Sequence, residues 1–444
     1  MSIKKSIYNE LILESNDRSR SVELIGGAIL FEYYEDIFSP TITAKIKVVD
    51  NGNVIAPENN QDGDKQSIYN GLPLRGGERL SLKIAGNSST NPGLDFSKRV
   101  DDYFYVSSIT DVISESNRET FTLHLVSREA ITNETVRVGK KFKVDTAISD
   151  SVENILRDYL KTNKIGTIDK SSNKYGFIGN LRKPFTILVW LASKAVPVSS
   201  GSATAGFLFY QTQDGFQFRS IDNLMEQTPK ATYTYTQSQQ SYDEKDSKIN
   251  NDFNILNYNI EKNQNLIEKL RLGTYASHRM FFNPLDFSFS NPEEGKFKLE
   301  DYVGKTNNLG SQIKLPPLSE GSNETLGDVP TRIITAVLDI GTINPGVSTD
   351  INSDQTLYQS QSLMRYNVLF TQTLNIVVAS NTNLRAGDII ECQFPKITES
   401  DAKEFDTETS GLYMIKELCH HFDVNNSYTS MKLVRDTFGI NKKA

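Results

Sequence analysis

The sequence predicts a multidomain, β-rich α+β protein in which a small antiparallel β-domain occurs twice. Three observations lead to this prediction. Apolar and polar residues alternate along most segments, which is typical of half-buried strands. Between residues 136 and 232 the apolar spacing changes to that of helices. A short motif at residues 74–84 returns near the other end of the chain, at residues 384–394.

Both copies of the motif begin Leu-Arg-x-Gly, continue with an acidic residue and then place an apolar residue at every second position. The first four residues alone are not specific, because Leu270–Gly273 also fits them. Beyond each copy, residues 104–126 match residues 412–434 without a gap. We infer an internal duplication of one β-domain, although any two antiparallel strand pairs look alike at this level.

Length and charge limit the classes of protein to consider. A chain of 444 residues is long enough for several domains with separate cores. The net charge of −7, without a basic stripe, argues against binding nucleic acid through its phosphates. Cys392 and Cys419 are too few for a disulfide framework; as parts of the same copy they could be neighbours, but we expect buried free thiols. No signal peptide pattern follows Met1, and no apolar run has the length of a transmembrane helix.

The first β-domain is predicted at residues 21–135, after a polar N-terminal arm at residues 1–20. Val22–Asp50 would supply two long strands, interrupted at Gly26–Gly27. Strand and turn patterns continue to residue 135 and would provide enough strands for a six-stranded barrel or sandwich.

Residues 136–232 are predicted to form a small α/β domain with two helices and a β-hairpin. Apolar residues at 148–160 have helical spacing, with Asp145 or Thr146 as the cap. A second helix is expected to begin at Pro184, a residue suited to the first helical turn. Two apolar runs that flank Asp214 and Gly215 predict the hairpin.

The second β-domain is predicted to consist of two pieces, residues 233–275 and 355–440, with an extended subdomain inserted at residues 276–354. Residues 270–282 are interpreted as a strand, and residues 355–366 as a helix.

We predict no catalytic, cofactor-binding or metal-binding residues. His420 and His421 follow Cys419, but neighbouring residues of a strand point to opposite faces, so the two histidines could not reach one metal without a bulge. The acidic loop 399–408 offers carboxylates, although its flanking Pro and Gly are more typical of a solvated loop. Trp190 is interpreted as a core residue. No nucleophile elbow, zinc-binding helix, phosphate-binding loop or dinucleotide-binding fingerprint occurs.

Residues 206–218, 273–277, 384–394 and 410–415 are similar to segments of one family. This family is the baseplate central hub protein of contractile-tailed (myovirus-type) bacteriophages, which is related to the hub part of secretion-system spike proteins. The order of the parts is also similar over nearly the whole chain. The separate motifs are not specific, and the ordered set carries the resemblance.

The resemblance implies that the two β-domains are tube-like β-barrels and that the chain forms a homotrimer. Its six barrels would make a pseudo-sixfold ring that joins a threefold central spike to the sixfold tail tube and forms part of the DNA passage. No fused spike follows the second barrel, so a separate spike protein is expected. Further implied partners are a tail tube or tube-initiator protein and baseplate wedge proteins. Neither membrane insertion nor specific nucleic-acid binding is expected. The protein would be located in the tail baseplate of the virion, and in the host cytoplasm during assembly.

A duplicated domain in a trimer is the simplest closed arrangement that matches six similar units to a threefold partner. Two other functions remain open. A receptor- or carbohydrate-binding tail protein would show exposed aromatic platforms. A tail-associated cell-wall hydrolase would need a cleft with two carboxylates at catalytic separation, and no segment resembles such an enzyme.

Overall fold

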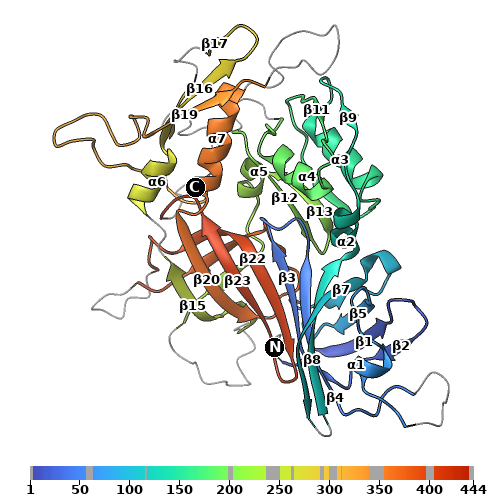
Figure 1. The fold of residues 1–444 in the computed structure, drawn as a ribbon. Coiled ribbons are helices and arrows are strands. Elements are labelled where there is room, and N and C mark those ends of the chain that lie inside the picture. Colours follow the sequence, from blue (N-terminus) through green and yellow to red (C-terminus); the bar gives the residue numbers. More distant parts are fainter. Residues whose placement is uncertain are drawn as a thin grey trace.

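Figure 1 shows the computed structural model of the chain. It describes residues 4–56, 64–115, 118–198, 204–236, 251–261, 265–290, 295–299, 308–311, 313–339, 355–396 and 405–439. Within these residues most strands belong to one 14-stranded sheet, and helices and smaller sheets cover one end of it. The β-rich α+β class expected from the sequence is confirmed. No helix in these ranges is long and apolar enough to cross a membrane.

The N-terminal strands form what we call the first β-repeat, in which β3-β4-β8-β7-β5-β1-β2 pair in this order and β6 pairs with β5. Its elements are β1 (Ile7–Glu14), β2 (Ser21–Glu23), β3 (Ala28–Asp36), β4 (Thr43–Asp50), α1 (Ile68–Gly71), β5 (Arg79–Ala85), β6 (Gly93–Asp95), a 3-10 turn (Val100–Asp102), β7 (Phe104–Glu115) and β8 (Arg118–Ser127). Alternate side chains of these strands meet in one apolar core.

The predicted N-terminal arm is wrong. Residues 7–14 form β1, which pairs with β5, and Leu11 and Leu13 are fully buried in the core. The alternation that marks β1 spans only a few residues between charged ones, and pairing with the distant β5 stabilises it.

The C-terminal strands form the second β-repeat. They are β14 (Thr232–Thr234), β15 (Ile255–Glu261), β20 (Gln372–Ala379), β21 (Ile389–Gln393), β22 (Gly411–Asp423) and β23 (Ser427–Arg435), with a 3-10 turn (Asn251–Phe253) before β15. The pairing order is β15-β20-β23-β22-β21-β14. A second apolar core lies beneath these strands.

The two β-repeats share one pairing scheme. The antiparallel order β5-β7-β8-β4-β3 corresponds strand by strand to β21-β22-β23-β20-β15. The two copies of the motif therefore lead into equivalent strands, β5 and β21. Even an irregularity is shared, because β3 shifts register between Ala28 and Leu30, and β15 between Ile255 and Asn257. The outer neighbours differ, since β1 is antiparallel to β5 whereas β14 is parallel to β21.

The gapless match between residues 104–126 and 412–434 is correct for only part of its length. Phe104 lies opposite Leu80, and Tyr413 lies opposite Ile390, so Phe104 corresponds to Tyr413 and not to Leu412. The shift of one residue arises because β7 carries two bulges where β22 carries one.

A small α/β part follows the first β-repeat. It contains α2 (Arg128–Thr135), β9 (Lys141–Phe142), α3 (Ile148–Asp158), β10 (Ile165–Ile168), β11 (Phe177–Ile178), α4 (Pro184–Ala192), β12 (Phe207–Thr212), β13 (Gly215–Ser220) and α5 (Ile221–Met225). The hairpin and the helix that begins at Pro184 are as predicted. The predicted cap of α3 is wrong, because Ala147 occupies that position without a side-chain hydrogen bond.

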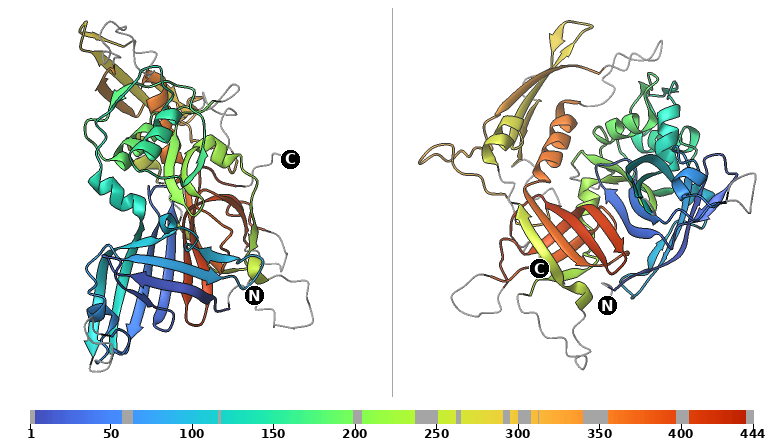
Figure 2. Two further views of the ribbon diagram at one scale, coloured as in Figure 1. Left: turned by 90° about the vertical axis from the view of Figure 1, so that its right-hand side faces the viewer. Right: turned by 60° about the horizontal axis from the view of Figure 1, so that its bottom comes forward.

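The inserted part projects beyond one end of the strands of the second β-repeat (Figure 2). Its elements are α6 (Leu266–Leu272), β16 (Ala276–Asn283), β17 (Ser288–Phe289), β18 (Lys296–Lys298), β19 (Arg332–Val337) and α7 (Gln355–Val368). The strand interpretation of residues 270–272 is wrong. The Asn265 side chain accepts a hydrogen bond from the Glu268 N–H, and Gly273 ends the helix with a φ of 69°.

The helix α7 packs against β16 and β18, so it lies with the inserted sheet, although the predicted boundary placed it with the second β-domain. Arg365 of α7 also forms a buried ion pair with Asp222 of α5 at 2.7 Å and lies 3.6 Å from Asp436, just beyond β23. Charge pairing thus connects α7 to both neighbouring parts of the chain.

Candidate functional site

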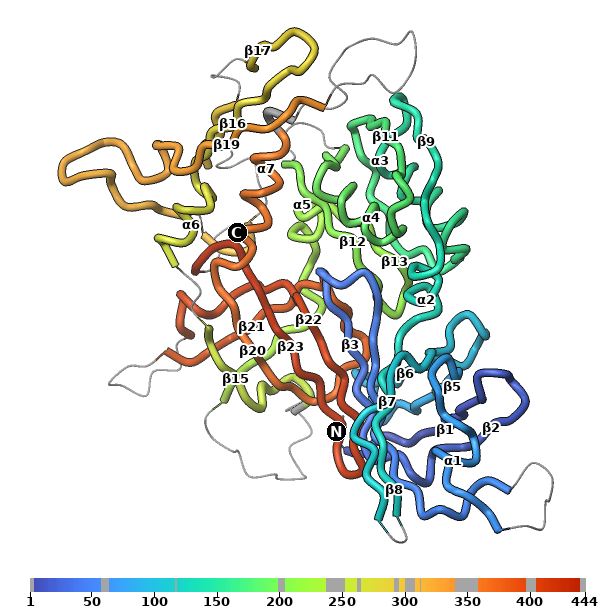
Figure 3. The backbone as a smooth tube through the Cα atoms, viewed as in Figure 1, coloured from blue at the N-terminus to red at the C-terminus, as the bar shows by residue number. Residues whose placement is uncertain are grey.

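The two β-repeats are joined edge to edge by β3 and β22. Seven residue pairs oppose one another in this antiparallel contact, from Glu417–Asp36 to Asp423–Leu30. Figure 3 shows the two strands side by side where the blue and red parts of the chain meet. The rings of Tyr33 and His420 stack at 6.1 Å across this contact. The large sheet is therefore continuous from one β-repeat into the other.

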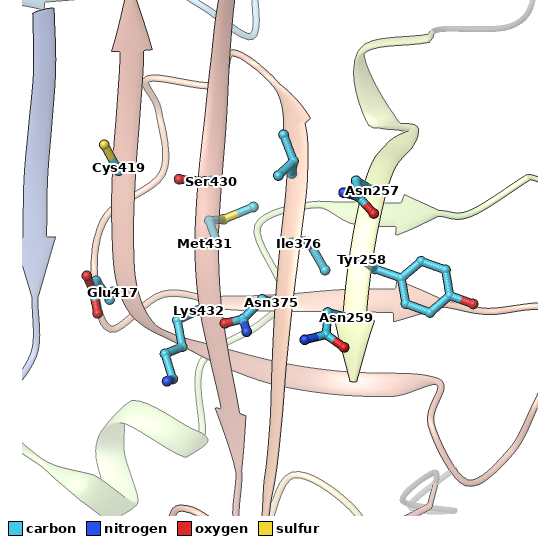
Figure 4. Close-up of a pocket in the computed structure, with 11 residues that line it drawn as sticks. Asn257, Tyr258, Asn259, Asn375, Ile376, Glu417, Cys419, Ser430, Met431 and Lys432 are labelled. Carbon is cyan, nitrogen blue, oxygen red and sulfur yellow. The ribbon is translucent and has the colours of Figure 1, made fainter. Parts of the chain in front are cut away.

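One face of this sheet is polar over both β-repeats. Residues directly opposite in antiparallel strands share a face, which places two rows of side chains on the side away from the cores: Asn259, Asn375, Lys432 and Glu417 in one row, and Tyr428, His421, Glu32, Lys45 and His124 in the other. We call this surface the polar face. An open depression of about 340 Å³ is lined by residues of β15, β20, β22 and β23, several of them on this face (Figure 4).

Carboxylates lie beside two lysines and one histidine of the polar face. Lys432 Nζ lies 3.7 Å from Glu261, and Lys45 Nζ lies 3.9 Å from Glu32. The same Glu32 lies 3.1 Å from the His421 ring, whose pKa is lowered by burial. A cation beside a carboxylate is less available to an outside anion. The face is thus hydrophilic without presenting a line of unpaired positive charge.

A buried carboxylate, Glu35, connects three parts of the chain. It lies on β3 and accepts hydrogen bonds from the Tyr33 hydroxyl at 2.7 Å, from the Gln213 N–H at 2.7 Å and from the Ala386 N–H at 2.9 Å. Burial raises the pKa of the Glu35 carboxyl, and the charge of Arg385 opposes this rise. The hairpin of the α/β part and the second motif copy are thereby both attached to the first β-repeat.

The repeated motif builds a turn before each equivalent strand. Its acidic residue accepts a hydrogen bond from the arginine N–H three positions earlier, at 2.7 Å for Glu78 and 2.8 Å for Asp388. The glycines before these acids have positive φ values, 85° for Gly77 and 91° for Gly387. A Cβ atom on Gly387 would also lie 2.4 Å from the Tyr210 hydroxyl. The motif therefore fixes the backbone turn before each strand.

The two histidines considered for metal binding point to opposite faces of β22. His420 is fully buried, with Nδ1 2.9 Å from the Thr429 hydroxyl, whereas His421 lies on the polar face. Cys392 and Cys419 are buried free thiols, and burial raises the pKa of each. Within the described ranges no three His, Cys, Asp or Glu residues are grouped as metal ligands. Much of the acidic loop 399–408 lies outside those ranges.

No family model matches the sequence. The probable baseplate hub protein gp334 of Vibrio phage KVP40 is 19% identical to this chain over 321 residues, which cover 72% of this chain and 73% of that protein. The resemblance to baseplate hub proteins is confirmed.

Two solved structures share the fold. The tail protein from Neisseria meningitidis MC58 matches with a TM-score of 0.51 at 10% identity, and 97% of each chain is covered. The 43 kDa tail protein of prophage MuSo2 from Shewanella oneidensis matches with a TM-score of 0.52 at 8% identity, covering 96% of this chain and 98% of that chain. The hub resemblance in sequence thus agrees with a tail-protein fold over nearly the whole length.

Sequence reasoning missed the β3–β22 contact and the role of Glu35. The hub resemblance gave the order of the parts but not the strands that join them. A weak signal was present at Glu35, a charged residue in register with the buried Phe31 and Tyr33. An acid at an inward position of a strand indicates a buried hydrogen-bonding partner.

Proposed function

We propose that this chain is a structural hub protein of a contractile phage tail baseplate. Three copies would form a ring of six β-repeats, which adapts a threefold central spike to the sixfold tail tube. The observation that carries the proposal is the shared pairing scheme of the two β-repeats together with their joining through β3 and β22. Two similar units in one continuous sheet are one third of such a ring.

The polar face suits the lining of a DNA passage. DNA carries dense negative charge, and unpaired lysines or arginines along a bore would bind its phosphates and retard it. The lysines named above lie beside carboxylates, and the chain as a whole carries a net charge of −7. We therefore assign the polar face to the inside of the ring, where it would let DNA pass without specific binding.

The proposed partners are a central spike protein, a tail tube or tube-initiator protein, and baseplate wedge proteins. The proposed location is the tail baseplate of the virion, after assembly in the host cytoplasm. Support comes from the hub resemblance, since gp334 of phage KVP40 is described as a probable baseplate hub protein.

The oligomeric state tests the ring directly. We expect light scattering on the purified chain to give a mass of three chains, and images of single particles to show a ring with six similar lobes. Adding the spike and tube proteins should preserve or promote this state. A chain that stays monomeric in the presence of both would contradict the proposal.

A structural role also predicts that the purified chain does not cleave cell-wall material. Zymography on peptidoglycan checks this, with lysozyme on the same gel as a positive control. A clear lytic band from the chain would favour the hydrolase alternative instead.

A receptor- or carbohydrate-binding tail protein is the second candidate. Phe287 and Phe289 are 79% and 61% exposed at the tip of the inserted sheet, and both rings contact Phe282. Exposed aromatic side chains of this kind stack on sugars. Binding of the chain to host surface polysaccharide, lost on replacing Phe287 and Phe289 with serine, would support this candidate.

A further inference from the structure

The α/β part and the inserted part carry opposite charges. Residues 136–232 contain 14 Lys and Arg against 8 Asp and Glu, whereas residues 276–354 contain 6 Lys and Arg against 11 Asp and Glu. The net charge of −7 therefore combines a basic part and an acidic part. Surfaces of opposite charge attract each other when they are brought face to face.

The basic part presents a ribbon of two short strands with apolar side chains on its outer side. In the pairing of β9 with β11, Phe142 lies opposite Phe177 and both are buried, so the next pair, Lys141 and Ile178, points outward. Ile178 is 48% exposed. Leu181 follows β11, is 68% exposed and has a φ of 54°, which residues with a side chain rarely adopt. Strained backbone of this kind is concentrated at binding and switch sites.

Three cations lie on the same ribbon. Bridges between Ala147 and Lys174 and between Val138 and Arg182 extend the ribbon beyond the two strands. Lys143, Lys174 and Arg182 are exposed, and among the described residues none forms an ion pair with them. We define the basic ribbon as Lys143, Lys174, Ile178, Leu181 and Arg182.

The acidic part projects as a hairpin between β18 and β19. The Leu318 N–H donates a hydrogen bond to the Glu324 carbonyl at 2.7 Å, and the Leu326 N–H donates one to the Pro316 carbonyl at 3.0 Å. At the base of the hairpin the Asp328 carboxylate accepts a hydrogen bond from a backbone N–H at 2.7 Å. These bonds give the projection a defined shape without a regular strand.

The tip of this hairpin combines carboxylates with an apolar side chain. Glu320 and Glu324 are exposed, and no residue in the described part of the chain forms an ion pair with either. Leu318, across the hairpin from Glu324, is 43% exposed. We call residues 316–325 the acidic finger. Its carboxylates are complementary to the cations of the basic ribbon, and its leucine is complementary to the apolar side chains there.

The acidic finger and the basic ribbon lie on opposite flanks of the chain, beyond the same end of the large sheet (Figures 1 and 2). In Figure 1 the finger is the orange loop at the far left, on the side of the second β-repeat, whereas β9 and β11 lie at the right, on the side of the first. In the proposed ring the second β-repeat of one copy is followed by the first β-repeat of the next. The finger of one copy would therefore face the ribbon of its neighbour.

We propose that the acidic finger of one copy docks on the basic ribbon of the next, with Leu318 against Ile178 and Leu181. Glu320 and Glu324 then lie beside the cations of the ribbon. The inference rests on the proposed ring and goes beyond it, because it assigns a contact outside the β-repeats to the inserted part and the α/β part. Contact between the leucines removes apolar surface from water, and the charges direct the approach.

A pair of cysteines tests the contact in the full-length chain. Leu318→Cys/Leu181→Cys places one thiol on the finger and one on the ribbon. The matched control, Leu318→Cys/Val424→Cys, moves the second thiol to the turn between β22 and β23, at the opposite end of the large sheet. All three side chains are exposed, so the substitutions do not disturb a core, and the native cysteines are buried.

After mild oxidation we expect Leu318→Cys/Leu181→Cys to give covalent species of two and three chains on a non-reducing gel, and the control to remain at one chain. Light scattering on the same samples separates the failures. A mass of three chains without cross-linking would overturn the finger contact while the ring stands. A mass of one chain without cross-linking, with the spike and tube proteins present, would overturn both. Equal cross-linking of the two variants would show random collision and would also overturn the contact.

Reversal of charge distinguishes a specific contact from simple proximity. In the Leu318→Cys/Leu181→Cys background, Glu320→Lys/Glu324→Lys is expected to slow cross-linking at low salt on the order of tenfold, because the finger then repels the ribbon. Adding Lys174→Glu/Arg182→Glu should restore the rate, and raising the salt concentration should reduce the difference. An unchanged rate after the first reversal, or no recovery after the second, would reject the docking of the finger on the ribbon.

Discussion

Replacing Glu35 with alanine is expected to lower the free energy of unfolding by about 3–5 kcal/mol. The carboxylate is 1% exposed and accepts hydrogen bonds from Tyr33, Gln213 and Ala386. Alanine would leave two backbone N–H groups and one hydroxyl buried without an acceptor, and would also create a cavity. Urea or thermal unfolding of the purified variant measures the loss.

Two further variants give this experiment its controls. Glu35→Gln keeps the shape and one acceptor oxygen, so it should cost clearly less than alanine. Glu417→Ala, on the neighbouring strand β22, removes a carboxylate whose side chain is 42% exposed and should cost no more than about 1 kcal/mol. If Glu35→Ala unfolds at the same midpoint as Glu417→Ala, the buried carboxylate does not hold the three parts together. Hydrogen exchange should rise first in β3 and in the β12–β13 hairpin.

Acid is expected to destabilise the chain through His420, by an amount on the order of 3 kcal/mol between about pH 6.5 and about pH 4. Burial, aided by the charge of Arg385, lowers the pKa of His420 from 6.5 to about 3. Between these pH values the His420 ring binds a proton in the unfolded chain but stays neutral in the folded chain. The neutral His420 ring therefore makes its full contribution to the free energy of unfolding above pH 6.5, and this contribution is lost as the pH falls.

The slope of unfolding free energy against pH is the quantity to measure, since it does not depend on the absolute stability of a variant. His420→Phe keeps an aromatic ring against Tyr33 and removes the titrating group, so its slope should be shallower than that of the wild type. The nearby Glu35 acts in the opposite direction, because its raised pKa favours the folded state as the carboxyl takes up a proton. Identical slopes for wild type and His420→Phe would show that other groups cause the acid sensitivity.

The features predicted correctly from the sequence are those determined by a few adjacent residues. The glycine turns before β5 and β21, the hairpin at Asp214 and Gly215, and the helix that begins at Pro184 each depend on a few adjacent residues with fixed backbone preferences. Such backbone preferences do not depend on contacts with distant parts of the chain. They are sufficient to locate the repeated unit without any long-range contact.

The contacts that assemble the site depend on distant partners and could not be predicted. β3 and β22 meet across nearly the full length of the chain, and nothing in either strand specifies the other. The sequence predicts a strand at residues 270–272 because Leu270 and Leu272 alternate with Arg271, whereas these residues belong to the helix α6. Its Asn265 cap and final Gly273 were present in the sequence and were the better guide.

The insertion between β15 and β20 occurs in only one of the two β-repeats. In a ring of alternating repeats, every second unit would carry the inserted sheet and α7, and the units between would not. The inner wall of the ring would then consist of six similar β-repeats. The rim would carry only three copies of the inserted part, one at every third of a turn. A partner that binds the rim would contact a threefold arrangement, whereas a partner that binds the inner wall would contact a pseudo-sixfold one. Both arrangements would be formed by the same chain.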